Sequence, residues 1–506
     1  MGINISSVYK QTVIERTGKL DAGEFELQFF DSRYMLKEED EEKWSGWLKP
    51  SCIPITIILI LIILVVLLPL LDHEKNDDNA TAGLNNLKYL RRNCSNTCVF
   101  QLVESIPENM TYTKGSPLHP SVFHGWLDLI EKAQNTIDIA SFYWTLQDSD
   151  VTPDPSAWEG EHVFQELLHA GTRRGIHIRI AQNKPSIYQP NYDTEYLVRK
   201  GAAKVHSVDF DRLIGAGVLH TKMWLIDSQH FYIGSANMDW RSLTQVKELG
   251  VIVYNCSCLA TDLAKIFEVY WMLGKKGADI PSTWPSSLYT NINAETPLAV
   301  SMNDTLTSVY LSSSPPQFCP NGRTNDIDSI LDVISKAQKY IYVAVMDYFP
   351  STLYTENKRY WPIIDDALRK AAVERQIHVR LLASWWNHTR SSMIYFLRSL
   401  AVLNSSDSYI EVKLFIVPSY SEAQGKIPFA RVNHNKYMVT DNSAYIGTSN
   451  WSGDYFINTG GIGFILNQSQ TGTASSQPIT EQLTAVFERD WFSEFAHSLS
   501  EFEEYG

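Results

Sequence analysis

Residues 220–227 read HTKMWLID and are followed by GSAN at 234–237, and the same polar pattern returns in HNKYMVTD at 434–441, followed by GTSN at 447–450. In each octet the His and the Lys are two residues apart, so both side chains point to one face of a strand. The apolar residues between them predict that the strand is buried. Two buried strands with matching polar residues indicate one site built from two halves.

The sequence around the two octets is also repeated. The matching pairs of segments are 127–144 with 331–348, 175–181 with 376–382, and 267–271 with 487–491. The pattern of each unit predicts an amphipathic helix, an apolar strand, a second helix and strand, and then the motif strand. This order favours a mixed or parallel sheet covered by helices. We therefore predict an α/β fold of two α/β/α sandwich lobes, residues 101–290 and 291–506, related by a pseudo-twofold axis and sharing one active site.

The N-terminal region contains a segment unlike the rest of the chain. Residues 52–71 contain no charged side chain, and such a helix matches the hydrocarbon thickness of a bilayer. A buried core helix is the alternative, but core helices rarely remain apolar on every face. We predict a signal-anchor transmembrane helix, with residues 1–51 as a cytosolic tail and residues 72–100 as a lumenal stalk.

Sequons and cysteines after this segment favour a lumenal C-terminal body. The candidate glycosylation sites are Asn79, Asn109, Asn255, Asn303, Asn387 and Asn404. The close cysteine pairs at 94–98 and 256–258 fit two disulfides in an oxidising compartment, and Cys319 remains as a free thiol. The spacing of these pairs is poor for zinc, so we predict no metal site here.

The composition restricts the classes of function. With 506 residues, 44% of them hydrophobic, the chain is long enough for two large cores. Its formal net charge of −14 argues against non-specific electrostatic binding of nucleic acid. A protein of this charge that handles phosphates must concentrate its cations at the site.

The repeated residues form an anion site with acid–base capacity, and its matching substrate is a phosphodiester. Lys222, Lys436, Asn237 and Asn450 would hold the non-bridging oxygens and offset the charge that grows in the transition state. One imidazole would attack phosphorus to give a phosphohistidine, and the other would protonate the leaving oxygen and then deprotonate water. Because the lysines supply positive charge, the mechanism needs no metal or other cofactor.

A difference between the halves suggests which histidine does which step. A nucleophilic histidine works best when its remote nitrogen donates to a carboxylate. Glu248 precedes an apolar strand in the first half, whereas the equivalent stretch of the second half has no acid. We therefore predict that Glu248 orients His220 as the nucleophile and that His434 is the general acid and base. Asp227 and Asp441 are expected to be structural residues of a turn or strand end.

Aromatic and acidic residues follow the first strand of each unit and are candidates for a substrate wall. They are Tyr143, Trp144, Asp347 and Tyr348. Most residues of these runs belong to the core, but those at strand ends could line the cleft. An aromatic ring there could stack on a nucleobase.

The paired H-x-K-x4-D and G-[ST]-x-N motifs resemble those of the phospholipase D superfamily over about residues 101–495. The stretches GVLHTKMWLID, RVNHNKYMVTD and YIGTSNWSGDYF are similar to the branch of family members three and four, and nearer to member three. This resemblance implies a 5′-to-3′ exonuclease on single-stranded DNA and RNA, which reaches late endosomes and lysosomes through the endoplasmic reticulum and Golgi and limits nucleic-acid sensing there. It also implies the disulfides Cys94–Cys258 and Cys98–Cys256.

Other functions stay open on the residues alone. A phospholipid could replace nucleic acid as the substrate, through hydrolysis or through transphosphatidylation when an alcohol replaces water. A non-catalytic membrane glycoprotein that serves as a docking surface is a third hypothesis, which the intact motifs disfavour. The expected partners are single-stranded nucleic acid, the membrane around the predicted span, and a second copy of the chain in a homodimer.

Overall fold

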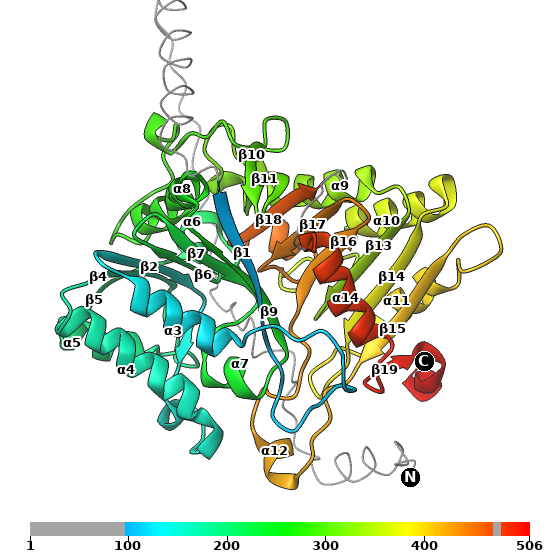
Figure 1. Ribbon diagram of the computed structural model, residues 1–506, viewed down its shortest axis with the longest axis horizontal. Helices are drawn as coiled ribbons and strands as arrows, with labels where there is room; N and C mark the ends of the chain where they lie inside the picture. Colours follow the sequence, from blue (N-terminus) through cyan, green and yellow to red (C-terminus); the bar gives the residue numbers. More distant parts are fainter. Residues whose placement is uncertain (1–96, 469–476, 506) are drawn as a thin grey trace, which may run out of the picture. The chain divides into compact units, whose positions relative to one another are not determined.

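A computed structural model describes residues 97–468 and 477–505 of the chain (Figure 1). The predicted cytosolic tail and span, most of the predicted stalk, Asn79 and Cys94 lie outside these residues. Within the described part of the chain, no helix is both long and apolar enough to cross a bilayer.

The strands of the two halves have the same order and the same directions. The first-half order is β1 (Thr97–Ser105), β9 (Glu248–Tyr254), β7 (His230–Gly234), β6 (Met223–Ile226), β2 (Thr136–Ser141), β4 (His177–Asn183) and β5 (Ala203–Val208). The second-half order is β11 (Thr305–Ser314), β18 (Gly461–Gln468), β17 (Ser443–Gly447), β16 (Lys436–Thr440), β13 (Tyr340–Val345), β14 (His378–Ser384) and β15 (Ile410–Phe415). In each half the last three strands are parallel and the others antiparallel.

The predicted mixed α/β architecture is therefore confirmed, but the two sheets are joined. Strand β10 (Leu298–Met302) pairs in parallel with β1 and antiparallel with β11, so hydrogen bonds run from one half into the other. The short strands β12 (Thr324–Asn325) and β19 (Ala496–Ser498) extend the second half, and β3 (Trp144–Thr145) pairs with β8 (Met238–Asp239). The boundary expected at residue 101 falls inside β1, because Thr97–Ser105 is one continuous strand.

Helices cover both faces of the sheets. The helices of the first half are α3 (Val122–Lys132), α4 (Trp158–Thr172), α5 (Tyr192–Arg199), α6 (Phe210–Ile214), α7 (Trp240–Thr244) and α8 (Ser257–Leu273). Those of the second half are α9 (Asp326–Lys336), α10 (Ile363–Arg375), α11 (Met393–Ala401), α12 (Glu422–Lys426), α13 (Asp454–Ile457) and α14 (Ile479–Trp491). Helices α3 and α9 end just before Ala133 and Ala337.

Successive side chains of the motif strands point to opposite faces, so they pack alternately in a central core and in one of two outer cores. In β6, Met223 and Leu225 join the core that contains residues of α8 and α14, whereas Trp224 packs in the outer core with α3 and α4. In β16, Tyr437 joins the same central core and Met438 packs in the outer core of the second half. Each motif strand is therefore buried on both faces, which fixes its register.

The two aspartates of the octets have the structural role expected from the sequence. The carboxylate of Asp227 accepts the backbone N–H groups of Gln134, Asn135 and Thr136, at 2.7, 2.8 and 2.6 Å. Asp441 accepts the N–H groups at positions 338 and 339, at 2.9 and 3.0 Å. Asp227 thus fastens its motif strand to the turn between α3 and β2. Asp441 does the same at the turn between α9 and β13.

One of the two predicted disulfides is present among the described residues. Cys98 in β1 is bonded to Cys256 before α8, with Cα atoms 4.9 Å apart. Cys258 is also disulfide-bonded, but its expected partner Cys94 lies outside the described residues. Cys319 is a free thiol, as predicted.

The sequons differ in their environment. Those with an exposed asparagine are Asn109, Asn255, Asn387 and Asn404. Asn303 instead uses its side-chain amide within the fold, because Oδ1 accepts the N–H of Phe100 at 2.8 Å and Nδ2 donates to its carbonyl at 2.9 Å. The four exposed positions are the ones that a glycan can occupy without replacing such contacts.

Candidate active site

Reciprocal backbone hydrogen bonds between the halves bring the two histidines together. His220 donates its N–H to the carbonyl of Gly460 at 2.9 Å, and Gly460 donates back to Val218 at 2.8 Å. In the equivalent contact, His434 donates to the carbonyl of Lys247 at 2.8 Å. The motif strand of the first half therefore begins beside the start of β18 in the second half. The motif strand of the second half begins beside the start of β9 in the first half. Both histidines come from one chain.

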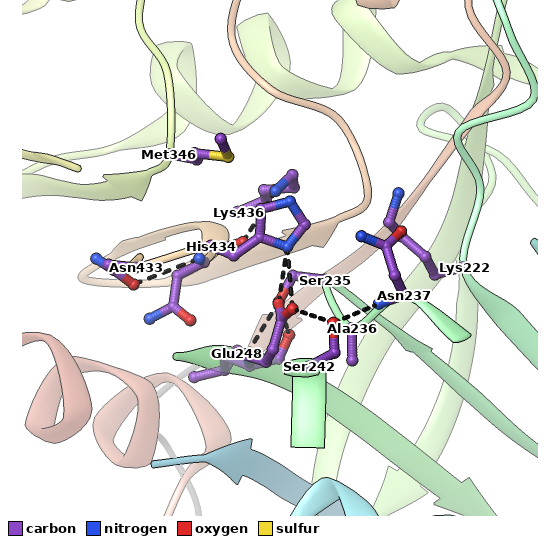
Figure 2. Close-up of polar contacts among 12 residues, drawn as sticks. Lys222, Ser235, Ala236, Asn237, Ser242, Glu248, Met346, Asn433, His434 and Lys436 are labelled. Atoms are coloured by element: carbon purple, nitrogen blue, oxygen red, sulfur yellow. Dashed lines mark hydrogen bonds and ion pairs between the residues drawn. The ribbon is translucent and has the colours of Figure 1, made fainter. Parts of the chain in front are cut away.

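The imidazole of His434 is bonded to Glu248, the first residue of β9. Its Nδ1 lies 3.1 and 2.9 Å from the two carboxylate oxygens, as Figure 2 shows. Glu248 is fully buried and also accepts the hydroxyl of Ser242 at 2.9 Å. The prediction that Glu248 orients His220 is thus wrong. The start of β9 lies beside the motif strand of the opposite half, so the acid reaches the opposite histidine.

His220 has a neutral partner in place of a carboxylate. Its Nδ1 lies 2.9 Å from the backbone carbonyl of Thr448, which can only accept. Nδ1 therefore carries the proton, and Nε2 presents its lone pair. Gly461 takes the position in β18 that Glu248 takes in β9. A Cβ at Gly461 would clash with the hydroxyls of Ser449 and Ser314, so a larger residue here would require both to move.

The electrostatics of the two imidazoles differ accordingly. Burial lowers the pKa of His220 well below its usual value, and the charges of Lys222, Lys436 and His434 lower it further. Burial also lowers the pKa of His434, but the carboxylate of Glu248 opposes this shift. His220 is therefore the imidazole that stays neutral, and His434 is the one that holds a proton more readily.

The G-[ST]-x-N turns, which follow β7 and β17, are closed in the same way. The hydroxyl of Ser235 accepts the N–H of Leu249 at 3.0 Å, and the hydroxyl of Thr448 accepts the N–H of Ile462 at 3.0 Å. These contacts fix the G-[ST]-x-N turns against β9 and β18. The asparagine that ends each turn is thereby fixed in position, and Figure 2 shows Asn237 in the same close-up as His434 and Glu248.

The lysines and asparagines line the same site. Lys222 and Lys436 donate to the backbone carbonyls of His220 and His434, at 2.7 and 2.9 Å. The buried polar atoms without a hydrogen-bond partner within the described residues include Nε2 of His220 and Oδ1 of Asn237 and Asn450. Buried polar atoms are nearly always satisfied in proteins, so these atoms indicate where a polar ligand binds. All three atoms are acceptors, so an anionic ligand at this site would be held by the N–H groups of Lys222, Lys436 and the asparagine Nδ2 atoms.

Half of the expected substrate wall lies at the site. The hydroxyl of Tyr143 is 3.3 Å from Nδ2 of Asn237, and the carboxylate of Asp347 is 3.2 Å from Nδ2 of Asn450. Trp144 and Tyr348 do not belong to the wall, because they are 1% and 2% exposed and lie in the outer cores. Side chains of successive residues at a strand end point to opposite sides, which explains why only the first of each pair faces the site.

Sequence reasoning missed two groups that contact His220. The ring of Tyr455 lies 5.0 Å from that of His220, and its hydroxyl is 3.1 Å from Nδ2 of Asn450. The carbonyl of Thr448 is the other missed group. The available signal for this carbonyl was Gly461, which aligns with Glu248 in the repeat. A glycine at that position indicates that a backbone group, and not a carboxylate, supports the other histidine.

A buried charge cluster supports the start of β9. Nζ of Lys247 lies 2.7 Å from the carboxylate of Asp490 in α14, and both side chains are fully buried. Asp490 also pairs with Arg489 at 3.0 Å and accepts the hydroxyl of Tyr112 at 2.6 Å. Arg489 in turn pairs with Glu104 of β1 at 2.8 Å. The two cations and two carboxylates balance each other and tie α14 to the residue that precedes Glu248.

Comparisons with known proteins place these features in a family. The model of the family described as "PLD3/4, PLD-like domain" matches residues 113–420. The chain is 54% identical over 406 residues to the 5′-3′ exonuclease PLD3 of Xenopus laevis, covering 80% of this chain and 81% of that protein. It is 46% identical over 415 residues to the 5′-3′ exonuclease PLD4 of Mus musculus, covering 80% of each.

A solved structure shares the fold at low sequence identity. The phosphatidylserine synthase of Haemophilus influenzae aligns with a TM-score of 0.51 and 12% identity, covering 80% of this chain and 88% of that one. At this identity the similarity concerns the fold alone.

The charge cluster generates a prediction about stability. Lys247→Met would leave the carboxylate of Asp490 without one of its buried cations, so the free energy of unfolding should fall by about 3–5 kcal/mol in chemical denaturation. The matched control is Lys336→Met, which breaks the exposed pair with Asp332 and should cost less than about 0.5 kcal/mol. Equal losses in the two variants would contradict the role given to the cluster.

Proposed function

Because the chain belongs to the PLD3/4, PLD-like domain family, we propose that it is a phosphodiesterase that removes nucleotides from the 5′ end of single-stranded DNA and RNA. The branch expected from the sequence is confirmed, and the higher identity to PLD3 than to PLD4 agrees with the nearer resemblance to member three. The observation that carries the proposal is the unequal pair of histidines, one bonded to a carbonyl and one to a carboxylate.

The two histidines divide the reaction between them. Nε2 of neutral His220 attacks phosphorus, and the P–O bond to the leaving 5′ oxygen breaks as His434 gives that oxygen its proton. Water then attacks the phosphohistidine, His434 takes the proton of that water, and the P–N bond breaks. The ammonium groups of the lysines and the Nδ2 amides of the asparagines donate to the non-bridging oxygens throughout. His220 therefore remains the proposed nucleophile, now because its tautomer is fixed by Thr448.

An acidic compartment suits this division of roles. His434 must be protonated in the first step although burial lowers its pKa, so the competent state becomes more populated as the pH falls below neutrality. The pKa of His220 is lowered further, so its imidazole stays unprotonated over the same range. The cleavage step is therefore favoured at mildly acidic pH.

The central experiment compares substrates at pH 5. The purified protein should shorten end-labelled single-stranded DNA from an unphosphorylated 5′ end and release 3′-mononucleotides. His220→Ala should abolish this release because no nucleophile remains, whereas His124→Ala on the surface should not affect it. Turnover of phosphatidylcholine or phosphatidylglycerol with intact DNA would support the lipid alternative. Inertness towards both substrates would support the docking hypothesis.

A second experiment tests the pairing of Glu248 with His434. Glu248→Gln removes the charge that raises the pKa of His434, so the basic limb of the pH–rate profile should move to lower pH. The value of kcat should fall by no more than the roughly 10²–10⁴-fold that general acid–base catalysis contributes. Glu131→Gln on the surface is the matched control. A basic limb that stays in place or moves to higher pH would contradict this role of Glu248.

We further infer that residues 52–71 anchor the protein with its catalytic body in the endolysosomal lumen, where degradation of nucleic acid limits its sensing. The Cys98–Cys256 disulfide and the exposed sequons support this topology. In mammalian cells, treatment with peptide-N-glycosidase should lower the apparent mass, and Asn→Gln at the four exposed sites should reduce that shift. A protein that carries no glycan and is digested by protease outside intact organelles would contradict this topology.

A further inference from the structure

Three aromatic side chains with no role in the catalytic step form a cluster beside the site. The rings of His388 and Phe429 are stacked with centroids 4.5 Å apart and an interplanar angle of 17°. The ring of Trp386 meets them edge-on, at 4.7 Å from His388 and 6.5 Å from Phe429. All three side chains are half-buried. We call this cluster the aromatic platform.

Packing and topology place the aromatic platform next to the catalytic residues. Trp386 packs against the small cluster of Val246, Met346 and Val432. Val246 precedes Glu248 by two positions and Val432 precedes His434 by two. Met346 follows the end of β13, beside His434 and Lys436 in Figure 2. Trp386 itself follows the end of β14, which lies at the same edge of the sheet because β13 and β14 are parallel.

The segment that carries Phe429 is held in a strained conformation. The φ angle of Phe429 is +54°, in the left-handed region that bulky residues seldom adopt. Arg241 from the first half donates to the carbonyl of the preceding Pro428 at 2.6 Å and so fixes the segment from across the interface. Such strain is concentrated at functional sites, because surrounding contacts must hold the residue in place.

The aromatic platform lies on the side of the general acid. The rings nearest to His220 are different ones, Phe142 at 5.3 Å and Tyr455 at 5.0 Å. In an in-line displacement the nucleophile and the leaving oxygen are on opposite sides of phosphorus. Groups around His434 therefore face the nucleoside that departs, which in 5′-to-3′ cleavage is the second nucleotide from the 5′ end.

We propose that the aromatic platform binds the nucleobase of this second nucleotide by stacking, an inference that rests on the proposed function. Every base has a π-face, so such a contact holds DNA and RNA of any sequence. A protein with a net charge of −14 gains little from general attraction to phosphates, which gives stacking a larger share of substrate binding. The contact also positions the leaving oxygen beside His434.

The test uses oligothymidylates with a 3′ fluorophore and one abasic unit, at position 1 or position 2 from the 5′ end. The first cleavage is followed at pH 5 as the product shorter by one unit. Loss of the base at position 2 should lower kcat/KM by roughly 5- to 150-fold, whereas loss at position 1 should have a smaller effect. An equal or larger effect at position 1 would overturn the assignment.

The aromatic platform is then tested by a double-mutant cycle. Phe429→Leu and His388→Ala should each bring the ratio of kcat/KM for the intact and position-2 abasic substrates close to one. Phe429→Trp, which keeps a ring, should preserve the ratio. Because both rates are measured on one variant, the ratio does not depend on the fraction that folds. Phe492→Leu, a matched change at an exposed phenylalanine, should leave the ratio unchanged.

The outcomes separate the two levels of inference. If the parent protein cleaves both oligonucleotides at the same rate, or if Phe429→Leu and His388→Ala keep the parent ratio, the aromatic platform does not bind the base and the exonuclease still stands. If the parent protein leaves every oligonucleotide intact, the proposed function itself fails.

Discussion

The site depends on backbone hydrogen bonds exchanged between the two halves where each motif strand begins. His220 is bonded to Gly460 and His434 to Lys247, so neither histidine is positioned by its own half alone. Backbone groups in a buried interface must be paired, which leaves the two strands one relative register. The separation and orientation of the imidazoles follow from this register. Catalysis and docking of the halves therefore use the same contacts.

The twofold repeat supplies two similar histidines, and a local difference makes them unlike. Glu248 and Gly461 take equivalent positions in β9 and β18, but only the first carries a side chain. The carboxylate favours a proton on His434, and the carbonyl of Thr448 fixes the neutral tautomer of His220. An acid and a nucleophile need opposite protonation states at one pH, and this difference provides them.

The surroundings of the site explain how a buried carboxylate and buried lysines are tolerated in an acidic protein. Lys247, Asp490, Arg489 and Glu104 form a balanced set of charges behind β9, so no single ion is left unpaired there. On the substrate side, the half-buried rings of the aromatic platform lie at the rim beside His434.

The sequence by itself determined the repeated α/β units, the two octets and the structural role of their aspartates, because strand alternation and turn chemistry are local properties. It also showed that only one half carries an acid. Only the tertiary structure decided that Glu248 contacts His434, that Thr448 supports His220, and that Trp144 and Tyr348 face the outer cores. These contacts join residues up to 228 positions apart. A local sequence pattern does not indicate whether a side chain contacts its own half or the opposite one.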